Sequence, residues 1–224
     1  SSLKIIESNA FSESSIQKVT FPDSVTKIGY NCFYDCDQLE TVEFSRNSKL
    51  NLIGENAFSN FQMQKRMRNK FDCNYYIGMY NSTGISNQNP QRFFKPHSLF
   101  NSIQNLSIPS SVVDFREAWC SSTASLINIT ILPNEIENIR LIEGKIIVGK
   151  SDIYKDEFDV ILFAARDIEN AVIPSCIKKI SSYAFAECYN IQKVEFSEDS
   201  QLEVIENNAF YESTIKSIMI PQNV

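Results

Sequence analysis

Hydrophobic positions recur along this chain with a fixed spacing. The stretch Ile53 to Phe58 has an aliphatic residue, three variable positions, a small residue and then phenylalanine. The unit returns every ~22 to 25 residues, and fixed periods of that size are typical of solenoids. We therefore expect stacked coils whose recurring phenylalanines form a single continuous internal column. The other copies are Ile6 to Phe11, Ile28 to Phe33, Ile180 to Phe185 and Ile205 to Phe210.

A second hydrophobic phrase follows most copies of the first and predicts a short strand in each unit. In the first unit, Val19 and Phe21 should point inward and Thr20 outward, because side chains alternate between the faces of a strand. Pro22 should end the strand, since proline cannot donate to a β-ladder. Stacking of the units would pair each strand with the next. The phrase recurs at Leu39 to Phe44, Ile191 to Phe196 and Ile215 to Ile220.

Asparagine precedes the small residue and phenylalanine in several units. Its side-chain oxygen can cap a short helical turn, so we expect short helical turns or 3-10 segments opposite the strands. The alternative is that asparagine is merely abundant in this chain. The asparagines are Asn9, Asn31, Asn56 and Asn208.

The pattern predicts one repeat domain over residues 1–224 with two irregular segments. Residues 59–98 form a degenerate or inserted segment, and residues 139–163 read as a β-hairpin insert, with strand-like runs Ile139 to Val148 and Phe158 to Phe163. Regular repeats should resume at Pro174. The chain starts and stops inside a repeat, so we expect a fragment of a longer array. Its end coils should bind missing repeats, a cap, or another copy end to end.

The repeat phrases resemble the BspA-like leucine-rich repeat family. The motifs IGENAFSNF, ISSYAFAECYNIQKVEF and VTFPDSVTKIGYNCFYDCDQLETVEF carry the likeness, which covers about two thirds of the chain, at 1–58, 103–136 and 174–224. The resemblance implies a leucine-rich-repeat solenoid, α/β or mainly β, with a parallel sheet on one face. It also implies a surface-exposed or secreted protein that binds host proteins or cells. Residues 59–98 and the aberrant unit at Trp119 depart from the family pattern.

Composition narrows the function classes. With 43% hydrophobic residues, 21% charged residues and a net charge of −6, the chain has no broad basic character. This argues against a general binder of nucleic acid or anionic membranes. No apolar run is long enough to span a bilayer, and the first residues do not read as a signal peptide.

The six cysteines do not form a dense disulfide pattern. Cys32 takes the small-residue position of the repeat, and Cys36 and Cys188 share another repeat position. Small buried hydrophobes behave in this way, so we expect free thiols in the core. A redox or metal pair at Cys32 and Cys36 is the alternative, although the chain has no CxxC motif and one histidine.

Strand alternation predicts two outward columns of side chains, which are free for ligand recognition because they do not serve the core. Their polar and mixed character fits a protein ligand better than a small molecule, although an ordinary solvated face is the alternative. The first column is Lys18, Thr41, Asn105, Asn128, Lys193 and Ser217, and the second is Thr20, Glu43, Ser107, Thr130, Glu195 and Met219.

Three further clusters have weaker functional interpretations. The glycosylation motifs at Asn105 and Asn128 fall in the first column, and the third is at Asn81; we expect them to be unused, or binding to occur elsewhere. A basic cluster could bind anionic polymers but reads better as a solvated loop. An acidic cluster offers oxygens to calcium but lacks the spacing of an EF-hand. The basic cluster is Lys65, Arg66, Arg68 and Lys70, and the acidic cluster is Asp152, Asp156, Glu157 and Asp159.

Catalysis finds little support in the sequence. His97 has no serine or cysteine elbow near it, and no glycine-rich phosphate loop follows a strand. Glu43 and Glu195, the acids of the second column, lie in distant units. The sequence therefore favours a non-enzymatic, cofactor-free protein-interaction module, such as the ectodomain of a surface adhesin or antigen. An intracellular scaffold and a carbohydrate-active solenoid remain the alternatives.

Overall fold

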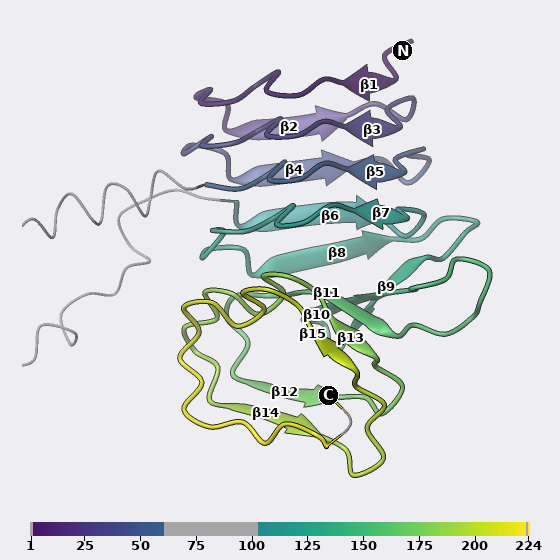
Figure 1. Ribbon diagram of the computed structural model, residues 1–224. Helices are drawn as coiled ribbons and strands as arrows, with labels where there is room; N and C mark the ends of the chain where they lie inside the picture. The colour runs from purple at the N-terminus through teal and green to yellow at the C-terminus, as the bar shows by residue number, and fades with distance from the viewer. Residues whose placement is uncertain (1, 61–102, 223) are drawn as a thin grey trace, which may run out of the picture.

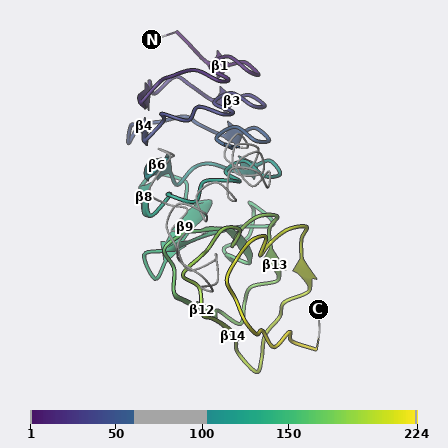
Figure 2. The ribbon, with the colours of Figure 1, turned by 90° about the vertical axis from the view of Figure 1, so that its left-hand side faces the viewer.

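The computed structural model describes residues 2–60, 103–222 and 224. These residues form fifteen strands, and none of them is helical. The N-terminal coils lie one above the other, and the C-terminal coils lie below them, turned relative to the upper stack (Figures 1 and 2). The solenoid predicted from the repeat spacing is confirmed.

The N-terminal half contains two parallel sheets, one on each of two faces of the coils. The predicted strand phrase forms one of them, with Phe21 buried and Lys18 and Thr20 exposed, as alternation requires. The aliphatic residue that opens each N-terminal Ile-to-Phe stretch lies, with the residue before it, in the other sheet, which we did not expect. The first sheet is β2 (Lys18–Phe21), β4 (Thr41–Phe44), β6 (Asn105–Pro109) and β8 (Asn128–Leu132); the second is β1 (Ile5–Ile6), β3 (Lys27–Ile28), β5 (Leu52–Ile53) and β7 (Asp114–Phe115).

The C-terminal half repeats this arrangement after an antiparallel excursion. β12 (Asn170–Ile173) pairs in parallel with β14 (Lys193–Phe196), and β11 (Val160–Ala164) pairs in parallel with β13 (Lys179–Ile180). The array therefore resumes at β11 and β12, before the expected restart at Pro174. The last strand, β15 (Val204–Ile205), pairs with β13.

The excursion is a three-stranded antiparallel meander. The run Ile139 to Val148, which we expected to be one strand, is split into β9 (Ile139–Ile142) and β10 (Ile146–Gly149). Gly144, with φ of 68°, makes the turn between them in a conformation that glycine adopts readily. β10 then pairs antiparallel with β11.

The β10–β11 hairpin separates two hydrophobic cores. Ile147 and Phe163 pack into the first core, whereas Ile146 and Ile161 pack into the second. Alternate residues of a strand point to opposite faces, so both faces of this hairpin are buried. The two cores share no buried residue among the described ones.

This separation corrects the prediction of one phenylalanine column. In the first core, the Phe33 ring lies between Phe11 and Phe58, with ring centroids 5.1 and 5.5 Å away. In the second core, Phe185 stacks on Phe210 at 5.0 Å. The recurring phenylalanines therefore form two stacks in two cores, because the hairpin intervenes between them.

The repeated asparagines are not helix caps. Asn9, Asn31, Asn56 and Asn208 have φ values of 61°, 51°, 51° and 56°, which lie in the left-handed region. Asparagine tolerates this region better than most residues, so it closes a turn here and does not start a helix. The Asn9 N–H donates to the carbonyl of Tyr30 in the next coil at 2.9 Å. The predicted helical turns are therefore stacked turns that bond to each other.

Gly54 is required by the close stacking of adjacent coils. A Cβ added there would lie 2.6 Å from the backbone carbon of Gly29, a distance that real Cβ atoms do not reach. We expect Gly54→Ala to lower the free energy of unfolding by about 1–3 kcal/mol, measured by guanidinium denaturation. Ser181→Ala is the matched control, since Ser181 donates its N–H at the same repeat position and already carries a Cβ. Equal stability of the two variants would contradict this account.

A buried arginine crosses between the two halves. Arg166, 2% exposed, donates from Nη2 to the Cys120 carbonyl at 3.3 Å and from Nη1 to the Ala184 carbonyl at 3.1 Å. Its guanidinium also lies 4.1 Å from the centroid of the Phe163 ring. Burial raises the pKa of nearby Glu187 to about 7, although the charge of Arg166 opposes this shift.

Candidate interaction surface

The parallel register aligns the two predicted columns on the sheet β2–β4–β6–β8. In the first row, each residue is the Cα partner of the next across the sheet, and in the second row the partners are Thr20 with Glu43 and Ser107 with Thr130. Ser107 also accepts a hydrogen bond at its Oγ from the N–H of Phe44, at 3.4 Å. All these residues are exposed or half-buried, so they form one polar face. The first row is Lys18, Thr41, Asn105 and Asn128.

The polar side chains of these rows bond to each other. Lys18 Nζ lies 2.8 Å from Glu43 Oε1, and Thr20 donates to the other carboxylate oxygen at 3.4 Å. The hydrogen bond from Lys18 lowers the pKa of Glu43. Asn128 donates from Nδ2 to Asn105 Oδ1 at 2.9 Å. Exposed pairs of this kind contribute about 0–1 kcal/mol, so a ligand can replace them at little cost.

The C-terminal candidates lie on a different sheet. Lys193 and Glu195 are in β14, where their Cα partners are Asn170 and Val172 of β12. Lys193 pairs with Glu195 at 2.6 Å along the strand. Ser217 and Met219 lie in no strand. The predicted columns are therefore two separate groups, because the sheet β2–β4–β6–β8 ends before the β10–β11 hairpin.

Sequence reasoning missed Asn170 and Val172. The phrase Ile168, Ala171, Ile173 has the spacing of the other strand phrases and ends at Pro174. That spacing indicates a strand at this position. We did not assign one, because we expected the repeats to resume only at Pro174.

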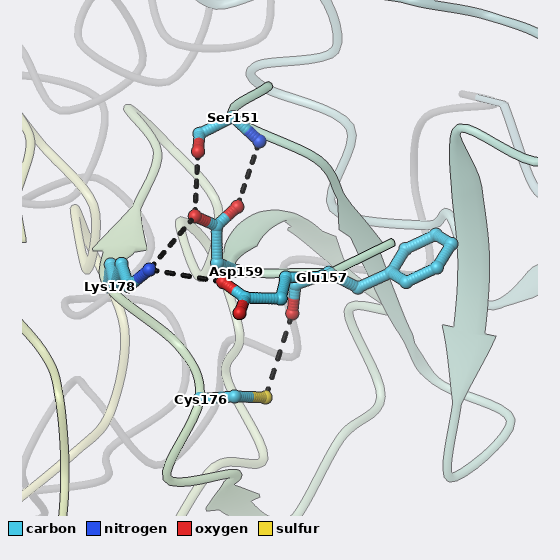
Figure 3. Close-up of polar contacts among 6 residues, drawn as sticks. Ser151, Glu157, Asp159, Cys176 and Lys178 are labelled. Carbon is cyan, nitrogen blue, oxygen red and sulfur yellow. Dashed lines mark hydrogen bonds and ion pairs between the residues drawn. The ribbon is translucent and has the colours of Figure 1, made fainter. Parts of the chain in front are cut away.

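The acidic loop between β10 and β11 is held by a buried carboxylate (Figure 3). Asp159, 4% exposed, accepts from the N–H of Ser151 at 2.8 Å and from its Oγ at 2.6 Å. Lys178 pairs with Glu157 at 3.2 Å and lies 3.9 Å from Asp159. In residues 2–60 and 103–222, no three His, Cys, Asp or Glu side chains are placed to hold a metal ion. The Asp159 carboxylate therefore anchors the loop through its bonds to Ser151.

The prediction of free thiols in the core is confirmed at four cysteines, whereas Cys176 is exposed and Cys73 lies outside the described residues. Cys32, Cys36 and Cys188 are free and buried. Burial raises the pKa of Cys32 to about 12 and raises that of Cys36 as well, which disfavours the thiolate that redox or metal chemistry needs. Cys120 is also free and buried.

Several sequence predictions lie outside the described residues. They are the glycosylation motif at Asn81, His97, most of the 59–98 segment, and the basic cluster of Lys65, Arg66, Arg68 and Lys70.

The sequence matches the model of the BspA type leucine-rich repeat region in 6 copies, over residues 1–80 and 157–224. The match covers more than half of the chain, so this protein belongs to the BspA-type leucine-rich repeat family. A comparison with curated proteins found no match. Nowhere in the described part of the chain is a helix both long and apolar enough to cross a membrane.

Solved structures of bacterial proteins share the fold. The pneumococcal vaccine antigen PcpA is 19% identical, with a TM-score of 0.66 over 100% of this chain and 44% of that one. A leucine-rich repeat protein from Eubacterium ventriosum is 16% identical, with a TM-score of 0.58 over 94% of this chain and 49% of that one. The chain thus spans less than half the length of either protein.

Proposed function

We propose that this chain is a non-enzymatic interaction module, displayed at a cell surface, that binds a protein ligand through the polar rows of the sheet β2–β4–β6–β8. The observation that carries the proposal is the register of that sheet. Four parallel strands place eight outward side chains in two aligned rows, none of which the core needs.

The character of the rows supports a protein ligand. Hydroxyl, amide, ammonium and carboxylate groups alternate over the face, and a protein surface can complement such a mixture along its whole length. Membership of the BspA-type family and the likeness of the fold to a pneumococcal antigen agree with display at a surface.

The test is a binding assay with a panel of purified extracellular-matrix proteins. Large charged residues placed within the rows should block contact, so we expect Thr41→Arg combined with Thr130→Arg to weaken binding about tenfold or more, as for interface residues that dominate affinity. Leu52→Arg is the control, because Leu52 is half-buried and points outward from the other sheet.

Two outcomes would contradict the proposal. Equal loss of binding in the row variant and the Leu52→Arg control would show that this sheet is not the binding face. No enrichment of any matrix protein above an unrelated solenoid would show that the chain does not bind matrix proteins. Turnover of glycans in a substrate panel would favour the carbohydrate-active alternative, and antibody labelling only after cells are permeabilised would favour the intracellular scaffold.

A further inference from the structure

The second N-terminal sheet ends at a free strand edge. Along this sheet two carbonyls at each strand accept hydrogen bonds from the next coil: the Asn51 carbonyl accepts from the N–H groups of Val113 and Asp114, both at 3.1 Å, and the Ile53 carbonyl accepts from the Arg116 N–H at 3.0 Å. The equivalent acceptors on β7 are the carbonyls of Val113 and Phe115. In this parallel register the Phe115 N–H faces the same edge.

The next coil does not pair with this edge. Its residues at the repeat position of β7 are Asn138 and Ile139, and both donate to the carbonyl of Ser110, at 2.7 and 3.2 Å. β9 therefore turns away from the sheet into the meander. Within the described chain, the Val113 carbonyl and the Phe115 N–H and carbonyl have no hydrogen-bond partner.

A groove of about 740 Å³ opens along this edge. Residues Val113 to Trp119 form one wall, and residues of β11, β13 and β15 form the opposite wall. Pockets of 300–1,000 Å³ with an apolar lining and a few polar groups are typical of ligand sites. The lining of this groove is more polar than apolar, and Leu162 and Val204, the latter 45% exposed, are among its aliphatic residues.

The charged groups of the groove balance, because two ion pairs line it and Glu117 and Lys150 add one charge of each sign. Arg116 lies 2.7 Å from Asp114, and Lys179 lies 3.2 Å from Glu206. With charges of both signs in equal number, the groove does not select an anion or a cation. It offers unpaired main-chain groups next to a mixed surface with a few aliphatic side chains, which fits an extended polypeptide.

We propose that this groove binds an extended peptide segment of a partner protein, which adds as a parallel strand to the free edge of β7. One peptide residue would donate its N–H to the Val113 carbonyl and accept from the Phe115 N–H. The residue two positions later would donate to the Phe115 carbonyl. These contacts repeat what Asp114 and Arg116 do for Asn51 and Ile53, and strand addition to an open edge is a general mode of peptide recognition.

The test uses a synthetic peptide that copies residues 49–56, which contain a strand already paired in parallel on both sides. Methylation of the backbone nitrogens at the positions of Leu52 and Gly54 removes both donors, so binding measured by calorimetry should weaken about tenfold. Methylation at the position of Ile53 is the matched control, because that nitrogen faces away from β7. The amide of Phe115 should exchange its hydrogen more slowly when the peptide is bound.

Variants of the protein locate the site. Val204→Trp should fill the groove and weaken peptide binding, whereas Ile5→Trp, at an outward strand position with 44% exposure, should leave it unchanged. Absence of binding at millimolar peptide, equal effects of the two methylated forms, or unchanged exchange at Phe115 would overturn the proposal. The groove shares no residue with the polar rows, so failure at one site leaves the other standing.

Discussion

Phe33→Ala should lower the free energy of unfolding by about 3–5 kcal/mol, the usual cost of truncating a buried phenylalanine. The Phe33 side chain is 1% exposed and contacts three rings: Phe11 and Phe58 by stacking, and Phe21 edge-on at 5.8 Å. Alanine would leave a cavity between coils that the surrounding main-chain hydrogen bonds prevent from closing. Guanidinium denaturation followed by the fluorescence of Trp119, which lies in the same core, measures the effect.

Phe11→Ala is the control for this prediction. Phe11 occupies the same repeat position but is 38% exposed, so truncation removes fewer contacts and should cost much less. If the two variants lost the same stability, the burial of the stacked ring would not be what stabilises the coil.

Arg166→Ala should destabilise the protein by at least about 3 kcal/mol, because two charge-assisted hydrogen bonds to buried carbonyls are lost together. The carbonyls belong to Cys120 of the first core and Ala184 of the second. The variant also uncovers the Phe163 ring and leaves Glu187 without its nearby positive charge. The same fluorescence assay measures this loss, since the Trp119 ring lies 5.6 Å from Phe163.

Arg140→Ala provides the matched comparison. Arg140 also covers a phenylalanine ring, Phe158 at 3.4 Å, but its side chain is exposed. Exposed contacts of this kind contribute about 0.5–1 kcal/mol. A loss in Arg166→Ala no larger than in Arg140→Ala would show that the buried hydrogen bonds do not join the two halves.

The repeat phrases predicted much of this architecture. Four-residue strands such as Lys18–Phe21 show alternation in the sequence, so the inward positions and the polar rows could be assigned before any coordinates. The small-residue position of Cys32 likewise predicted burial, which the structure confirms.

Other features left no readable pattern. A two-residue strand such as Leu52–Ile53 is too short to alternate, so the second sheet was not expected. Asn31 indicated a special backbone position, yet a capping residue and a left-handed turn residue share the same amino acid preference. β7 has a free edge because Asn138 donates its N–H to Ser110 and not to β7. This is a contact between coils, so the local sequence does not predict it.

The β10–β11 hairpin acts as a partition with hydrophobic packing on both sides. In an uninterrupted stack, damage to one winding exposes the next, and fraying can travel along the whole array. The hairpin should stop this fraying, because the core on each side of it has its own set of buried residues. We therefore expect one core to keep its packing when the other is cut by a protease.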